Sequence, residues 1–233
     1  MDYGTLIGDS FTYVKEGIID KVNKWLLLSI ATLILVIPLM GYIMGVYRGT
    51  TPAPEVENWS KLIVDGILLI IVSIIYAIPA FILWFLIIGL AFASIQNSPT
   101  GMMTGMMSNM VGAGLLGILI IVVIIFAIIS PIGIIRFART AKFGEAFYFG
   151  EIITTIKKIG WLSYILTLII GVIVVLIPGL ILEAVCAVLV IKLLIPGSVI
   201  AGILFIVVLP ILTIFYARYL TQVYESAGTV LVR

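Results

Sequence analysis

Residues 136–161, RFARTAKFGEAFYFGEIITTIKKIGW, lie between two long apolar tracts and carry seven charged residues. From residue 149 the apolar side chains recur every three or four positions, and threonines and charged side chains fall between them. This is the period of an amphipathic helix, and it predicts a helix that lies on a membrane surface. The segment therefore divides one membrane domain into an N-terminal half, 1–135, and a C-terminal half, 136–233.

The composition identifies the lipid bilayer as the solvent of this chain. Of its 233 residues, 63% are hydrophobic and 10% are charged, and the mean hydropathy is +1.35. Water-soluble domains carry about 25% charged residues. We therefore expect an all-α, polytopic helical bundle in the cell membrane, with membrane lipids as its partners.

The charge and the residue types exclude several classes of function. The net charge is +2 and no basic cluster occurs outside 136–161, so nucleic acid is not an expected partner. One cysteine, Cys186, and the lack of histidine exclude an internal disulfide and a histidine-ligated metal site. The sequence contains no phosphate-binding loop and no catalytic acid–base pattern, so we expect neither an enzyme nor a bound cofactor.

The uncharged runs predict five to six membrane spans. An amphipathic stretch at 9–24, capped at Asp9 or Ser10, precedes the first span, which Pro38 should kink or break. The segment 180–195 is short, so it is either a fifth span or a broken, re-entrant segment. The expected spans are 25–47, 62–95, 110–135, 161–182, 180–195 and 199–219.

Two features of the sequence suggest an internal repeat. Phe11 precedes Trp25 by 14 residues, and Phe147 precedes Trp161 by the same interval. The segments PIGIIRFAR and PILTIFYAR, one in each half, also match, although the intervening lengths differ. Three spans in each half would invert the second half relative to the first, as in many secondary transporters. A 3+3 inverted repeat is therefore one hypothesis for the architecture.

Residues 41–83, GYIMGVYRGTTPAPEVENWSKLIVDGILLIIVSIIYAIPAFIL, combine several recognisable features. A Gly-Tyr pair near the end of a span is followed by an arginine and by a Pro-acidic-Trp segment. An Asp-Gly pair then opens a long span with a later proline. These residues are Gly41, Tyr42, Arg48, Pro54, Glu55, Trp59, Asp65, Gly66 and Pro79.

In these features the stretch resembles a prokaryotic membrane-protein family, domain of unknown function 4013. Glu57-Asn58 is a mild departure, since the family pattern has a second acidic pair there. The resemblance implies a multi-pass membrane protein with a defined structural element at 54–66. It implies no catalytic residue.

Glu183 and Lys192 are candidates for an intramembrane polar site. Charged side chains are costly in the hydrocarbon core, so their presence is a hypothesis of function. Nine residues apart on a straight helix, the two side chains point to different sides and do not pair directly. The alternative is that both lie near the ends of spans, where they reach the lipid headgroups.

A second group of charges lies at the expected ends of spans. Lys61 and Asp65 are spaced i, i+4, and Asp65 also has Arg48 and Arg136 as candidate partners. The arginines that end the two matching segments are suited to contacts with lipid phosphates. The predicted interfacial charge cluster comprises Arg48, Lys61, Asp65, Arg136, Arg139 and Arg218.

The segment GMMTGMMSNM at 101–110 places Met102, Met106 and Met110 on one face of a helix. Thioethers are ligands that suit Cu(I), so a metal path is one interpretation. The other is that methionine fills space beside a stripe of small residues. Such a stripe would also suit contact between copies of the chain.

Two hypotheses of function follow. The first is a transporter or channel for a small solute or ion, supported by the proline-broken spans and by Glu183 and Lys192. The second is a non-catalytic membrane scaffold or lipid-organising protein, supported by the amphipathic helices and the sparse intramembrane polarity. A water-filled cavity lined by charged groups would favour the first, and an apolar groove open to lipid would favour the second.

Overall fold

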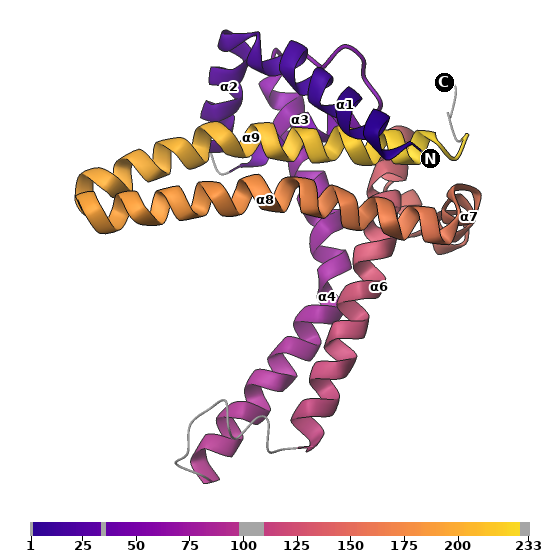
Figure 1. Cartoon of the computed structure of the whole chain (residues 1–233). Coiled ribbons are helices and arrows are strands. Elements are labelled where there is room, and N and C mark those ends of the chain that lie inside the picture. The colour runs from indigo at the N-terminus through magenta and orange to yellow at the C-terminus, as the bar shows by residue number, and fades with distance from the viewer. Residues whose placement is uncertain (1, 34–35, 98–109, 229–233) are drawn as a thin grey trace.

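The computed structural model describes residues 2–33, 36–97 and 110–228, and every regular element in these ranges is helical (Figure 1). Two of the elements are single turns of other helix types, a π-helix (η1) and a 3-10 helix (η2). In chain order the elements are α1 (Tyr3–Val14), η1 (Lys15–Ile19), α2 (Val22–Leu33), α3 (Ile37–Tyr47), α4 (Trp59–Asn97), α6 (Met110–Thr140), η2 (Phe143–Phe147), α7 (Phe149–Ile159), α8 (Trp161–Leu193) and α9 (Ile195–Glu225).

Two helical hairpins extend in different directions from a common base (Figure 1). One hairpin is α4 with α6, and the other is α8 with α9. The base consists of α1, α2, α3 and α7 packed around the ends of the hairpin helices, and α9 contacts α1, α2 and α3. Almost all of the long-range packing between the two halves of the chain therefore occurs in the base.

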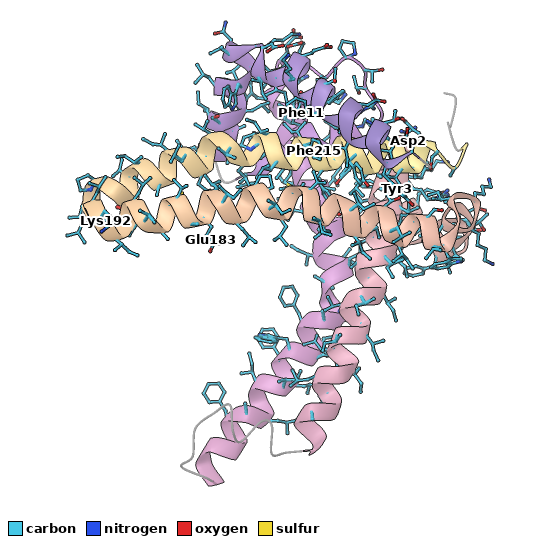
Figure 2. The ribbon with its side chains drawn as sticks, viewed as in Figure 1. Asp2, Tyr3, Phe11, Glu183, Lys192 and Phe215 are labelled. Atoms are coloured by element: carbon cyan, nitrogen blue, oxygen red, sulfur yellow. The ribbon has the colours of Figure 1, made fainter. Side chains whose placement is uncertain are left out.

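The hydrophobic core lies in the base rather than along the hairpins. One cluster joins α3, α4 and α6 to α9, and includes Tyr42, Phe137 and Ile214. Another joins α6 and α7 to α8 and α9, and includes Ile156 and Tyr164. By contrast, the most apolar windows of the four long helices are only 11–22% buried, and Figure 2 shows apolar sticks projecting outward from both hairpins.

Within the described residues, four helices are long and apolar enough to cross a membrane: Trp59–Phe92, Gly112–Thr140, Trp161–Leu193 and Ile195–Glu225. Each continues through an internal proline without ending. In the membrane, neighbouring helices and local adjustments satisfy the carbonyl that a proline leaves free. The expected all-helical architecture is thus confirmed, with helices suited to a membrane by length and composition, while the number of spans and the inverted repeat remain predictions.

The first expected span, 25–47, is not one continuous helix. It comprises the short helices α2 and α3, with Val36 in the left-handed region at φ 63°. Pro38 lies in the first turn of α3, where a missing N–H costs nothing. Pro38 therefore marks the predicted break.

The predicted cap at Asp9 or Ser10 was wrong, because α1 begins earlier and Asp2 caps it by accepting from the Gly4 N–H at 2.9 Å.

The prediction that 180–195 is a separate span or a re-entrant segment was also wrong. Residues 180–193 continue α8, which ends only at Leu193, and Ile195 already belongs to α9. The chain reverses at Leu194, with φ 51° and ψ −119°, and Pro196 lies in the first turn of α9. Pro178-Gly179 does not break the helix, so the second half has two long helices rather than three.

The predicted amphipathic helix in 136–161 is confirmed as α7. Lys157 and Lys158 are exposed, whereas Ile152, Thr155 and Ile156 are buried. The apolar face does not lie on lipid as predicted, because it packs against α6, α8 and α9 in the second core cluster. A helical period shows that one face is apolar, but it does not distinguish burial in protein from contact with lipid.

Buried tyrosines link the helices of the base through hydrogen bonds to backbone carbonyls. The Tyr164 hydroxyl of α8 donates to the Ile128 carbonyl of α6 at 2.7 Å. The Tyr219 hydroxyl of α9 donates to the Thr167 carbonyl of α8 at 3.0 Å. Both tyrosines are fully buried, so each ring contributes apolar packing while its hydroxyl remains satisfied.

The backbones of α3 and α4 approach each other most closely at two glycines. A Cβ added to Gly41 would lie 1.8 Å from the Leu62 carbonyl oxygen, and a Cβ added to Gly66 would lie 2.0 Å from the Ile37 carbonyl oxygen. Distances this short are forbidden for real side chains, and the opposing atoms belong to the backbone. The two glycines therefore set how closely α3 and α4 cross.

Replacing Gly66 by Ala should lower the stability of the folded protein by about 1–3 kcal/mol, because the methyl group forces the two backbones apart. Thermal or denaturant unfolding in detergent measures this effect. Gly89, also in α4, is a matched control because nothing lies within 4 Å of its added Cβ. Gly89→Ala should leave stability unchanged or raise it by up to about 1 kcal/mol through helix propensity. Equal effects of the two changes would contradict the role of the crossing.

Candidate functional site

The polar residues of the base surround the segment between α3 and α4, residues 50–58, which we call the α3–α4 loop. Ala53 and Val56 of this loop are buried against the base. Gly17 of η1 lies beneath Ala53, since a Cβ added to Gly17 would be 2.6 Å from the Ala53 Cβ. The loop is therefore held on one side by η1 and on the other by α3 and α4.

Arg48 and Asp65 form a bidentate ion pair at the foot of the α3–α4 crossing. The Arg48 Nη1 and Nη2 atoms donate to the two carboxylate oxygens of Asp65 at 2.6 and 2.8 Å. The side chains are 23% and 11% exposed. This confirms the predicted partnership of Asp65 with Arg48. The alternatives were wrong, because Asp65 forms no ion pair with Lys61 or Arg136, all of which the structure describes.

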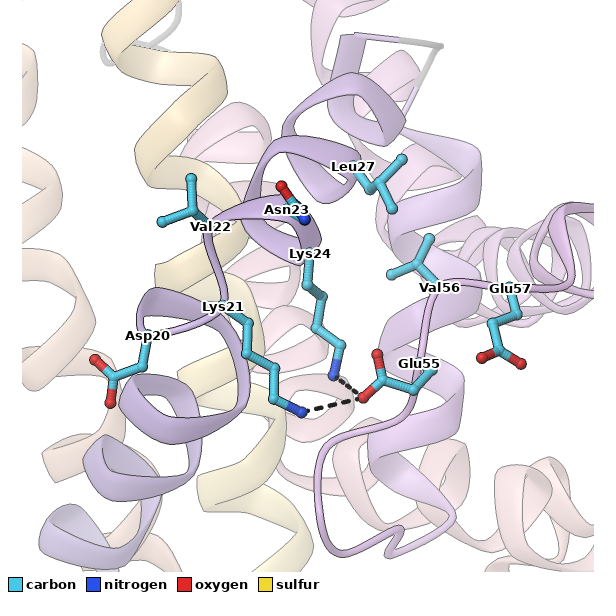
Figure 3. A pocket seen from close by; sticks show the side chains of 9 residues that line it. All are labelled: Asp20, Lys21, Val22, Asn23, Lys24, Leu27, Glu55, Val56 and Glu57. Carbon is cyan, nitrogen blue, oxygen red and sulfur yellow. Dashed lines mark hydrogen bonds and ion pairs between the residues drawn. The ribbon is translucent and has the colours of Figure 1, made fainter.

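A second polar contact holds the start of α2 to the same loop (Figure 3). Lys21 and Lys24 converge on the Glu55 Oε1 atom, at 3.2 and 2.9 Å. The Lys24 side chain is only 4% exposed, and its Nζ atom also donates to the Ala53 carbonyl at 3.1 Å. The hydrogen bond from Lys24 lowers the pKa of Glu55 below its ordinary value of 4.5, and Lys21 adds to this effect.

Two pockets lie on either side of the α3–α4 loop. The first has a volume of about 650 Å³ and is lined by the two lysines, Glu55 and the exposed acids Asp20 and Glu57 (Figure 3). The second has a volume of about 300 Å³, and its lining includes Lys61 and the Arg48–Asp65 pair. Glu55 and Glu57 line both pockets, so the loop forms the wall between them.

Two further arginines of the predicted cluster join the end of α6 to other elements of the base. Arg136 donates to Glu145 at 2.5 Å and so holds η2 against α6. Arg139 donates to Glu225 at 2.5 Å and to the Tyr47 carbonyl at 3.3 Å. These contacts connect α6 with α9 and α3. The sequence does not indicate Glu145 or Glu225 as partners, because Glu225 is 86 residues from Arg139 and Glu145 pairs with Arg136 only through the fold of η2 against α6.

Arg218 differs from the other arginines of the cluster in lacking a carboxylate partner, although Arg139 is likewise stacked on a tyrosine, with 5.1 Å between its Cζ atom and the Tyr224 ring centroid. The Arg218 guanidinium lies over the Tyr13 ring, with 4.9 Å between the Cζ atom and the ring centroid. It forms no ion pair with any acidic side chain that the structure describes, and its buried Nε atom has no hydrogen-bond partner there. The predicted cluster therefore consists of three arginines paired with carboxylates, the aspartate that pairs with Arg48, one exposed lysine, and Arg218, which has no acidic partner among the described residues.

Glu183 and Lys192 both lie on α8, Lys192 at the far end of the α8–α9 hairpin and Glu183 partway along it (Figure 2). Both are exposed, and neither forms an ion pair among the described residues. Glu183 lines a pocket of about 560 Å³ between α8 and α9, whose other lining residues are apolar except for Cys186 and Thr213. The structure keeps Glu183 and Lys192 apart, and their spacing along the helix predicts this separation.

The methionine stripe is not tested by the structure. Met102 and Met106 lie outside the described residues, and Met110 is described only as the first residue of α6. The remaining described residues contain no cluster of three or more His, Cys, Asp or Glu side chains arranged for a metal ion.

Comparison with known proteins places this architecture in a family. A family model described as "Protein of unknown function (DUF4013)" matches residues 25–187. The chain belongs to this family. No curated protein and no solved structure matches the chain.

The DUF4013 match runs from the start of α2 to the second half of α8. It contains both crossing glycines, the Arg48–Asp65 pair, the α3–α4 loop and α7. It excludes α1 and α9, which supply Tyr13, Arg218 and Glu225. The resemblance predicted from residues 41–83 is thus confirmed, and the matched region extends well beyond that stretch.

The arrangement of charges in this DUF4013 protein suits the fixing of helices. Three carboxylates, those of Asp65, Glu145 and Glu225, each accept from one guanidinium across an element boundary. Charge-assisted hydrogen bonds of this kind are short and directional, and a bidentate pair also fixes orientation. In the partly buried base, each pair holds two elements in one relative position.

Asp65→Asn should lower the free energy of unfolding by about 2 kcal/mol or more, because Arg48 would be left partly buried without an anionic partner. Arg48→Lys should also destabilise, since a lysine does not reproduce the two parallel hydrogen bonds. Lys61→Gln removes an exposed charge from the same helix and should change stability by no more than about 0.5 kcal/mol. Denaturant unfolding in detergent gives all three free energies of unfolding. An Asp65→Asn protein as stable as Lys61→Gln would contradict a stabilising role for the Arg48–Asp65 ion pair.

Glu55 should make the stability of the protein depend on acid pH. Since its pKa is lowered in the folded state, its contribution is present above pH 4.5 and is lost as the pH falls through the lowered pKa. Melting temperatures of wild type and Glu55→Gln between pH 6 and pH 3 measure the difference. We expect wild type to be the more stable at pH 6 and the two curves to converge at the acid end. Parallel curves would show that Lys24 and Lys21 do not stabilise the carboxylate.

Proposed function

We propose that this protein is a non-catalytic, lipid-organising scaffold of the cell membrane. In this proposal the two hairpins contact lipid along most of their length, and the base holds them in a fixed relative direction. The observation that carries the proposal is the exposure of apolar side chains along both hairpins. Examples are Phe85 at 69%, Ile121 at 59%, Ile181 at 60% and Ile203 at 56% exposed.

The lengths of the hairpin helices support the same proposal. Helix α8 has 33 residues and therefore spans about 50 Å at 1.5 Å per residue. The hydrocarbon core of a bilayer is about 30 Å thick. Apolar helices longer than the core tilt or thicken the bilayer locally, so such hairpins act on the lipid around them.

The position of the charged groups also favours a scaffold over a transporter. The paired charges lie in the base, where they hold helices together. Along the described parts of the hairpins beyond the base, Glu183 and Lys192 are the charged side chains. A route for an ion or polar solute needs polar groups along its length, and the pocket between α8 and α9 is lined mainly by apolar residues.

Transport of a small solute or ion is the second candidate, and Glu183 is the observation that favours it. Its carboxylate lines the pocket between α8 and α9 together with Cys186 and Thr213. An acidic group in an apolar pocket suits binding of a cation or exchange of a proton. This candidate differs from the scaffold in requiring net movement of solute across the bilayer.

Reconstitution into liposomes separates the two functions. For a scaffold, spin-labelled phospholipids should show an immobilised component that increases with protein content, because the exposed hairpins order adjacent chains. Flux of monovalent ions and small solutes should equal that of protein-free liposomes. Flux above this background that falls in Glu183→Gln, but not in Lys192→Gln, would replace the scaffold by the transporter. Absence of the immobilised lipid component would also contradict the scaffold.

A further inference from the structure

We infer that Arg218 binds the phosphate group of an anionic membrane lipid at the junction of α1 and α9. The inference rests on the proposed function in requiring that the hairpins lie in lipid, and it identifies the lipid group that the base recognises. From the sequence alone, Arg139 and Arg218 are equally suited to contact lipid phosphates. The structure separates the two residues, because Arg139 is neutralised by Glu225 and Arg218 is not.

The arginines of the base differ in whether a carboxylate balances their charge. Arg48, Arg136 and Arg139 each donate to a carboxylate. Arg218 is half-buried, yet it has no acidic partner within ion-pair distance among the described residues, and Asp9 and Glu16 of the adjacent α1–η1 segment do not supply one. A partly buried guanidinium without an anion is costly, so a bound anion would offset that cost.

Arg218 has hydrogen-bond donors that no described residue uses. A guanidinium carries five N–H donors in a planar fork that matches phosphate. In Arg218 the Nε atom is buried without a partner in the described part of the chain, as in Arg136, so the terminal Nη groups are the donors open to a phosphate. The ring of Tyr13 covers one face of the group. The Tyr13 hydroxyl is itself fixed by donating to the Thr50 carbonyl at 3.0 Å. Stacking on a fixed ring restricts the guanidinium, which lowers the entropy lost when a ligand binds.

The position of Arg218 along α9 indicates that the phosphate belongs to a lipid. Residues 193–217 contain no charge, and Arg218 is the first charged residue after them. Such a run is long enough to cross the hydrocarbon core, so its end lies at the level of the headgroups. Beyond Arg218 the helix carries Thr221, Gln222 and Glu225, whose side chains bond to other parts of the base.

The test is the retention of anionic lipid by the whole protein. Wild type and variants are placed in nanodiscs of mixed phosphatidylcholine and phosphatidylglycerol, and the lipids that stay bound on release are counted by native mass spectrometry. Arg218→Gln should bind phosphatidylglycerol about tenfold more weakly than wild type, since it loses charge-assisted hydrogen bonds to the phosphate. Arg218→Lys should show an intermediate loss, because it keeps the charge and loses the fork.

Control variants distinguish the Arg218 site from a general effect of charge. Lys192→Gln removes one positive charge at the far end of the α8–α9 hairpin (Figure 2) and should retain phosphatidylglycerol as wild type does. Tyr13→Leu removes the ring that covers one face of the guanidinium and should weaken retention. Tyr13→Phe keeps the ring but loses the hydroxyl that fixes it, so its retention should lie between those of wild type and Tyr13→Leu. Arg218→Gln with wild-type retention, or equal losses in Arg218→Gln and Lys192→Gln, would overturn the inference.

The source of the phosphate is tested separately in detergent. Protection of the protein against heating by inorganic phosphate, without protection by phosphatidylglycerol, would overturn the lipid assignment. Should Arg218→Gln fail to fold, Arg218→Lys and Tyr13→Leu carry the same comparison. The immobilised lipid component in pure phosphatidylcholine reports on the scaffold itself, and it should be unchanged in Arg218→Gln. Loss of that component in wild type would contradict the scaffold and not the site.

Discussion

The close crossing of α3 and α4 is the constraint on which the rest of the base depends. At Gly41 and Gly66 each helix meets a backbone carbonyl of the other, so a larger residue at either position would move the helices apart. This spacing places Arg48, just after α3, opposite Asp65, in the second turn of α4, at bidentate distance. The α3–α4 loop then folds back over the pair and presents Glu55 to Lys24. One steric requirement thus positions two ion pairs and two pockets.

A membrane protein with few buried residues must fix the arrangement of its helices without a strong hydrophobic effect, and here the base provides the contacts that do so. Lipid provides little hydrophobic driving force between helices, because its chains are as apolar as the side chains. Packing and directional polar contacts must then determine the arrangement. In this protein the tyrosine-to-carbonyl hydrogen bonds and the three arginine clamps provide those contacts, and they are concentrated where six or more segments meet. The hairpins beyond the base carry few such contacts and are correspondingly exposed.

The sequence was sufficient to predict features that depend on local chemistry. The apolar runs, the break near Pro38, the amphipathic helix α7 and the family all follow from composition, period or motif. Features that depend on tertiary packing were predicted less well. The continuation of α8 through 180–195 depends on a helix tolerating Pro178, and the burial of α7 depends on which surface covers its apolar face. Nothing in the sequence indicates that Lys24 is buried, because its partner Glu55 lies 31 residues away. Arg139 and Arg218 looked equivalent, and only the position of Glu225 distinguishes them.

Helix α9 is synthesised after the helices that it packs against, so its position in the core affects how the protein assembles. Residues 214–224 of α9 complete both core clusters of the base, against partners drawn from α1, α3, α6 and α8. During translation the earlier hairpin and the short helices emerge before α9 exists. They enter the bilayer with their shared core still open, and it closes only when α9 arrives. A nascent chain that stalls within α9 therefore leaves both core clusters incomplete.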